Sequence, residues 1–100
     1  MIVKKHKTPD GKLILAVCDS EIIGKKFVQG NAQLDLSSDF YKGTEMNEEK
    51  TAELIKFAYI VNMTGEKAVK LGLKKGIVEE ENIVKICNVP HAEAVIVRDE

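Results

Sequence analysis

The chain has 100 residues, of which 44% are apolar and 31% are charged, and its formal net charge is −1. This length suits one domain with one core, and the balanced charge excludes a protein that binds polyanions through its overall charge. The 2 cysteines exclude the disulfide scaffold of small secreted domains, and no apolar run approaches the roughly 18 residues of a membrane span. We therefore expect one cytoplasmic domain that makes no contact with a membrane.

The N-terminal part of the chain has the pattern of a β-hairpin. Ile2 to His6 forms a short strand, Thr8 to Gly11 supplies the turn, and Leu13 to Asp19 forms a second strand. Both alternating faces of the second strand are apolar up to Cys18, which predicts a central strand covered on both sides. After a helical turn at Ser20 to Gly24, Ala32 to Leu36 alternates as a third strand with one wet face.

Two helices are expected next. Asn47 is a good N-cap for the first helix, and the apolar run from Phe57 to Met63 continues it. A helix that is apolar all round is buried in its own domain or against a partner. Asn62 interrupts this run, and we expect its amide to bond to a neighbouring loop. The second helix runs from Gly65 to Lys75, is capped by Glu66 at its positive end, and stops at Gly76.

Two further strands are predicted to close the chain. They are Ile83 to Cys87 and Ala94 to Arg98, around a turn from Asn88 to His91. The order of elements predicts a single α+β domain over residues 1–100. We expect a mostly antiparallel sheet with two helices packed on one side.

Several short strings also occur in the order found in a small archaeal family of unknown function, numbered 424. They are Ala16 to Asp19, Ile23 to Lys25, Phe40 to Gly43, Gly65 to Val69 and Val89 to Ala92. Through these strings the chain resembles that family over nearly its whole length. The resemblance implies a cytoplasmic archaeal α+β protein with no agreed activity and a suspected connection to RNA or translation. Cys87 departs from the family pattern, in which glycine is commoner, and this argues against a mechanism that needs both cysteines.

Cys18, Asp19 and His91 are the candidate catalytic residues. Pro90 stiffens the backbone before His91, which would hold the imidazole in a fixed direction as acid or base. Cys18 would need a base such as His91 to form a thiolate. The structural alternatives are a histidine bonded to a backbone carbonyl, a buried core thiol and a carboxylate that caps or turns the chain. We expect neither cofactor nor metal, because zinc-site spacing is absent among His6, Cys18, Cys87 and His91.

Lysines are concentrated in two places, and all but one of the 15 basic residues are lysines. Lys67, Lys70 and Lys74 fall within an arc of roughly 60° on the second helix, with Lys75 nearby. The N-terminal hairpin has a second group, Lys4, Lys5, Lys7 and Lys12. No aromatic residue is interleaved with these lysines along the chain, which disfavours sequence-specific recognition of single strands.

The preferred interpretation is a small non-catalytic protein that binds RNA or a ribonucleoprotein through the lysines of the second helix. The structural alternative for these lysines is the solvated face of an amphipathic helix. Two other functions stay open. One is an enzyme that uses His91 with Cys18 or Asp19, and the other is an interaction subunit or homo-oligomer joined through the apolar helix at 57–63.

Overall fold

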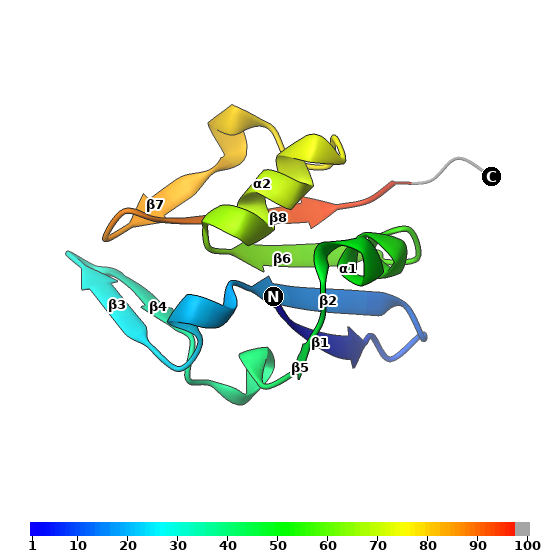
Figure 1. Ribbon diagram of the computed structural model, residues 1–100, viewed down its shortest axis with the longest axis horizontal. Helices are drawn as coiled ribbons and strands as arrows, with labels where there is room; N and C mark the ends of the chain where they lie inside the picture. Colours follow the sequence, from blue (N-terminus) through cyan, green and yellow to red (C-terminus); the bar gives the residue numbers. More distant parts are fainter. Residues whose placement is uncertain (98–100) are drawn as a thin grey trace.

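The computed structural model describes residues 1–97, and its main element is a six-stranded sheet (Figure 1). The strands are β1 (Ile2–Lys7), β2 (Leu13–Cys18), β5 (Thr44–Glu45), β6 (Ile60–Thr64), β7 (Val84–Ile86) and β8 (Val89–Val95). Their order across the sheet is β5-β1-β2-β6-β8-β7. Neighbouring strands are antiparallel except β2 and β6, which are parallel. A separate hairpin of β3 (Lys26–Gln29) and β4 (Ala32–Asp35) lies beside one end of the sheet.

Two α-helices lie on one face of the sheet (Figure 1), and three 3-10 turns connect other elements. The helices are α1 (Glu48–Ile55) and α2 (Glu66–Lys74), and the turns are η1 (Ser20–Ile22), η2 (Asp39–Tyr41) and η3 (Glu80–Asn82). Within residues 1–97, neither helix is long enough to cross a membrane.

Local signals set the ends of both helices. The Asn47 side chain accepts a hydrogen bond from the backbone N–H of Lys50 at 2.8 Å, as expected of an N-cap. After α2, Gly76 has a φ of 72°. Its N–H donates to Leu73, and the N–H of Ile77 donates to Gly72. This pattern closes the helix as a Schellman motif, for which glycine is the favoured residue. The predicted end of the second helix is therefore confirmed.

The core has two layers, one on each side of the sheet. Leu15 and Val17 of β2 face the helices and pack in one cluster with residues such as Met63. Ala16 and Cys18 face the other way and pack against the segment that follows β4. Since β2 lies between β1 and β6 with both faces covered, its predicted central position is confirmed. The predicted α+β class, with both helices on one side, is confirmed as well.

The helix expected over Phe57 to Met63 is wrong. Helix α1 ends at Ile55, and Ile60–Thr64 is strand β6, which pairs with β2 and with β8. A short apolar run fits a buried strand and a buried helix equally well by periodicity. The β-branched residues of this run favour the strand, and its two apolar faces suit a central place in the sheet. The interaction subunit therefore loses the apolar helix on which that interpretation was based.

The closing hairpin also differs from the expectation. Strand β8 is Val89–Val95, so Pro90 and His91 lie within a strand and not in a turn. The turn is made by Cys87 and Asn88, with φ values of 51° and 65°. Two successive residues with positive φ form the tight turn whose twist matches antiparallel strands. Arg98, placed in the last predicted strand, lies outside the described residues.

Val17→Asp tests the central position of β2. The Val17 side chain is 0% exposed, and Val17 is paired with Val3 and Met63 on the neighbouring strands. Burying an unpaired carboxylate costs several kcal/mol, against a total stability of roughly 5–15 kcal/mol. We expect the variant to lose cooperative urea unfolding, measured by circular dichroism. The same change at Val84, which is 59% exposed, is the control and should leave the transition nearly unchanged. A cooperatively folded Val17→Asp variant would contradict the assignment.

Candidate functional site

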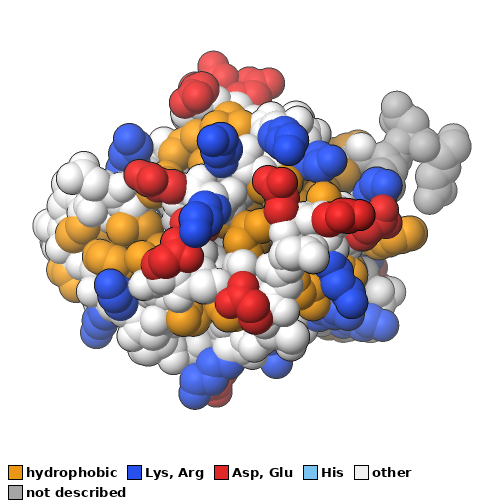
Figure 2. Space-filling model, in the orientation of Figure 1, with side chains coloured by type: hydrophobic (Ala, Val, Ile, Leu, Met, Phe, Trp, Pro, Cys, Tyr) orange, Lys and Arg blue, Asp and Glu red, His pale blue; other side chains and the backbone are white. Residues whose placement is uncertain are grey.

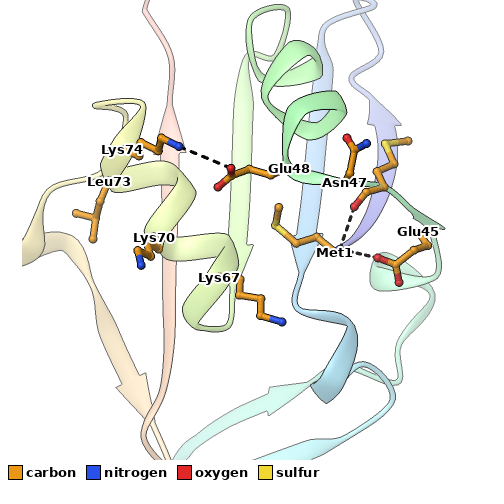
Figure 3. Close-up of a pocket in the computed structure, with 9 residues that line it drawn as sticks. Met1, Glu45, Asn47, Glu48, Lys67, Lys70, Leu73 and Lys74 are labelled. Carbon is orange, nitrogen blue, oxygen red and sulfur yellow. Dashed lines mark hydrogen bonds and ion pairs between the residues drawn. The ribbon is translucent and has the colours of Figure 1, made fainter.

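An open groove runs between α2 and the segment that joins β5 to α1 (Figure 3). One wall is formed by Lys67, Lys70 and Lys74 of α2. These lysines are exposed because the opposite side of α2, which includes Ala68 and Leu71, packs on the sheet. The groove has a volume of about 980 Å³. Its other lining residues are Met1, Glu45, Met46, Asn47, Glu48 and Leu73.

The groove carries charges of both signs. The Lys67 ammonium lies 3.1 Å from a Glu21 carboxylate oxygen, and that of Lys74 lies 3.7 Å from Glu48 across the groove. Within residues 1–97, Lys70 makes no ion pair, and Lys75 lies outside the groove. Figure 2 shows acidic side chains among the basic ones over both helices. The ion pairs are exposed, and such pairs are worth only about 0–1 kcal/mol, so a ligand anion could replace either carboxylate.

The N-terminal ammonium group closes one end of this groove. It donates to the Glu45 carboxylate at 2.6 Å and to the Met46 carbonyl at 3.0 Å (Figure 3). The bond from this ammonium lowers the pKa of Glu45, and a second bond from Ser20 adds to the effect. Glu45 is therefore held as an anion by protein groups. The lysine wall is the part of the groove that suits a ligand anion.

The N-terminus of α2 is occupied by Asp19. This carboxylate is buried and accepts hydrogen bonds from the backbone N–H groups of Lys67 at 2.9 Å and Ala68 at 2.8 Å. A carboxylate placed there satisfies free N–H groups and complements the positive end of the helix dipole. The expectation that Glu66 makes this cap is wrong, because Glu66 is exposed and Asp19 comes from the end of β2. The cap leaves these N–H groups unable to bind phosphate.

Gly65 makes room for the Asp19 cap. Its φ of 105° and ψ of 161° lie in a region that is essentially restricted to glycine. A Cβ atom at this position would lie 2.3 Å from the Asp19 carboxyl carbon. The N–H of Gly65 donates to the Pro90 carbonyl at 2.9 Å. The end of β2, the start of α2 and the start of β8 therefore meet at one glycine.

Cys18 is a core residue. Its side chain is 0% exposed, and its thiol donates to the Asp19 carbonyl at 3.4 Å. Burial raises the pKa of this thiol to about 12, and a protonated thiol is a poor nucleophile. Cys18 and His91 pair with the same residue, Thr64, from opposite sides of β6. One strand therefore separates them, and the geometry gives no support to a cysteine–histidine catalytic pair.

His91 belongs to a chain of polar side chains on the sheet face opposite the helices. Its Nδ1 atom lies 2.8 Å from the Thr64 hydroxyl, which lies 3.4 Å from the Tyr41 hydroxyl. Tyr41 donates to the Asn62 amide oxygen at 3.1 Å. The prediction that Asn62 bonds to a neighbouring loop is confirmed, because Tyr41 belongs to η2. These bonds hold η2 against the sheet, and sequence reasoning missed both Tyr41 and Thr64.

The four side chains with zinc-ligand chemistry lie apart. His6 stacks on Phe40 with ring centroids 4.6 Å apart. Cys87 is exposed in the turn before β8, where its thiol donates to the Val28 carbonyl at 3.2 Å. In the described part of the chain, no three His, Cys, Asp or Glu side chains are grouped to hold a metal ion.

Gly65→Ala tests the junction. We expect it to destabilise the fold by more than the roughly 1–3 kcal/mol of a strained backbone, because the new methyl group also displaces Asp19. Gly30→Ala is the matched control, since Gly30 has a φ of 60° but no atom within 4 Å of the added Cβ. Urea unfolding of both variants separates the two effects. Equal losses of stability would contradict a role of Gly65 in admitting Asp19.

The stability of the fold should depend on the protonation of His91. Burial lowers the pKa of His91 below its ordinary value of 6.5, so the folded chain binds fewer protons than the unfolded chain between these two pKa values. The contribution of neutral His91 to the free energy of unfolding should be fully present above pH 6.5. It should be lost as the pH drops from 6.5 through the lowered pKa. His91→Gln should flatten this part of a plot of unfolding free energy against pH. An unchanged slope in His91→Gln would assign the dependence to other groups.

Comparison with known proteins agrees with this architecture. A family model described as "Protein of unknown function (DUF424)" matches residues 6–97. The chain is also similar to an uncharacterised conserved protein from Methanopyrus kandleri, whose crystal structure superposes with a TM-score of 0.82. The two are 27% identical over 99% of this chain and 93% of the other. No curated protein matches the chain. The chain belongs to the DUF424 family.

Proposed function

We propose that this protein is a non-catalytic binding protein that holds RNA by its phosphates through the lysine wall of the groove beside α2. The observation that carries the proposal is the exposed row of Lys67, Lys70 and Lys74 along one wall of an open groove. Lysine offers a flexible point charge, which suits phosphate contacts that do not depend on base sequence. Lys75, just beyond the end of α2, lies outside the groove and lines a neighbouring depression with Lys74, Glu48 and Glu49.

The positions of the lysines support this use. Lys67 and Lys74 are separated by seven residues, or about 10 Å along the helix axis at 1.5 Å per residue. A flexible RNA strand can place its phosphates along this row of lysines. Glu21 and Glu48 compete with phosphate for Lys67 and Lys74. Because these pairs are exposed and weak, we expect phosphate to displace them at low salt.

A salt titration tests the proposal. Neutralising phosphate with lysine releases counterions, so log affinity for RNA should fall linearly with log salt. Replacing Lys67, Lys70 and Lys74 with glutamine should reduce that slope by roughly 0.7–0.9 for each lysine that binds a phosphate, with binding weakened alike for one structured and one unstructured RNA. Glu48→Gln frees Lys74 and should strengthen binding.

The control is a second triple variant, in which the exposed Lys25, Lys26 and Lys85 become glutamine. This variant makes the same change in net charge outside the groove. Its slope of log affinity against log salt should be closer to that of the wild type than the slope of the first triple variant. Equal slopes for the two triple variants, or no wild-type binding at about 50 mM salt, would contradict the proposed function.

A further inference from the structure

A second depression lies at the opposite end of α1, beside the turn between β1 and β2. Its lining combines three lysines with two aromatic residues, and the full set is Lys5, Lys7, Gly11, Lys12, Leu13, Leu54, Phe57, Tyr59, Ile96 and Val97. No carboxylate is among these lining residues in the described part of the chain. This depression shares no residue with the groove beside α2. Figure 2 shows basic side chains next to apolar ones at this end of the molecule.

Phe57 is the unusual residue of this surface. Its side chain is 72% exposed, and it follows directly after α1. The backbone around it is fixed, because the Phe57 N–H donates to Leu54 at 3.0 Å and the Tyr59 N–H donates to Leu13 at 2.8 Å. The exposed Phe57 ring is therefore attached to a backbone whose position is fixed by hydrogen bonds. Val97, which is 85% exposed, lines the same depression, and exposed apolar side chains gathered in one place mark binding surfaces.

The three lysines surround this patch from the hairpin. Lys5 and Lys7 alternate on β1 and point to the same face of the sheet as Val3, which packs in the core layer under the helices. The Lys12 ammonium lies 4.4 Å from the centroid of the Tyr59 ring. A cation over an aromatic face is attracted by the ring. The Asp10 carboxylate, 3.7 Å away, also attracts this ammonium, so both residues position the charge. Lys12 therefore lies over Tyr59, and the exposed Phe57 ring is available for stacking.

We propose that this surface binds single-stranded RNA, with a base stacked on Phe57 and phosphates held by Lys5, Lys7 and Lys12. Exposed aromatic rings beside positive charges are the usual platform for single strands, and stacking tolerates any base. Asp10 lies 3.7 Å from the Lys12 ammonium, and the remaining excess of positive charge from Lys5 and Lys7 complements a polyanion better than a balanced surface would. The inference rests on the proposed function for the choice of RNA, but it uses other residues and predicts a preference for unpaired bases.

The test uses stacking as its readout. Because the chain has 0 tryptophans, Phe57→Trp introduces a single tryptophan, which can be excited apart from the tyrosines, at the proposed stacking position. Addition of single-stranded oligoadenylate of about 12 nucleotides, within the usual site size, should quench its emission. Inorganic polyphosphate, which carries charge without bases, should not. Val84→Trp places the fluorophore at an exposed position outside both surfaces and should show no quenching.

Affinity measurements complete the test. Phe57→Ala should weaken binding of the oligoadenylate about 5- to 150-fold, as expected for the loss of one stacked base, and should leave the salt slope and the affinity for an RNA duplex unchanged. Replacing Lys5, Lys7 and Lys12 with glutamine should lower the slope by roughly 2. Phe57→Trp without quenching, or Phe57→Ala with wild-type affinity, overturns the inference. A Phe57→Ala variant that changes only the monomer–dimer equilibrium in sedimentation also overturns it, because the surface would then join two copies.

The two proposals fail in different ways. If Phe57→Ala weakens binding and the glutamine variant of the α2 lysines does not, the inference about the hairpin surface is supported and the groove does not bind RNA. If only the α2 variant weakens binding, the inference about Phe57 is overturned and the proposed function stands. Absence of wild-type binding to any of these RNAs at about 50 mM salt overturns both.

Discussion

The placement of α2 depends on one buried carboxylate. Asp19 follows the central strand and accepts hydrogen bonds from the first N–H groups of α2, whose residues are nearly 50 positions further along the chain. A buried carboxylate is costly unless it is hydrogen-bonded, so this contact both requires and fixes the position of the helix. Glycine is the only residue type at position 65 that leaves room for the Asp19 side chain, because any Cβ atom there would overlap the carboxyl group. Because this contact fixes the position of α2, it also determines where the lysines of α2 lie.

The candidate catalytic side chains lie at or near this same junction of Asp19 with α2. Asp19 is occupied by two N–H donors, and the Cys18 thiol is protonated because it is buried. His91 is engaged with Thr64 in the polar chain that holds η2 to the sheet. Each of these candidate side chains therefore has a structural task, and the exposed polar groups lie elsewhere. This arrangement is the reason why we propose binding at the surface and not catalysis at the sheet.

The two lysine surfaces differ in their surroundings. The groove beside α2 mixes lysines with Glu45 and Glu48, which weakens its positive field. The depression at the hairpin has three lysines beside an exposed aromatic ring, and one of them, Lys12, forms an ion pair with Asp10. We therefore propose the first for phosphates of any RNA and the second for a strand whose bases are free to stack. The aromatic residues missing among the lysines in the sequence are supplied there by the fold.

The sequence by itself determined the features that depend on neighbouring residues. The Asn47 cap, the stop at Gly76, the buried strand Leu13–Cys18, the α+β class and the family resemblance could all be predicted, because each is encoded within a few positions. Only the tertiary structure decided whether residues 60–64 form a helix or a strand, since an apolar run fits both until β2 and β8 pair with it. It also decided the partner of Asp19 and the meeting of Phe57 with the hairpin lysines. These contacts join residues some 50 positions apart, and no local pattern specifies them.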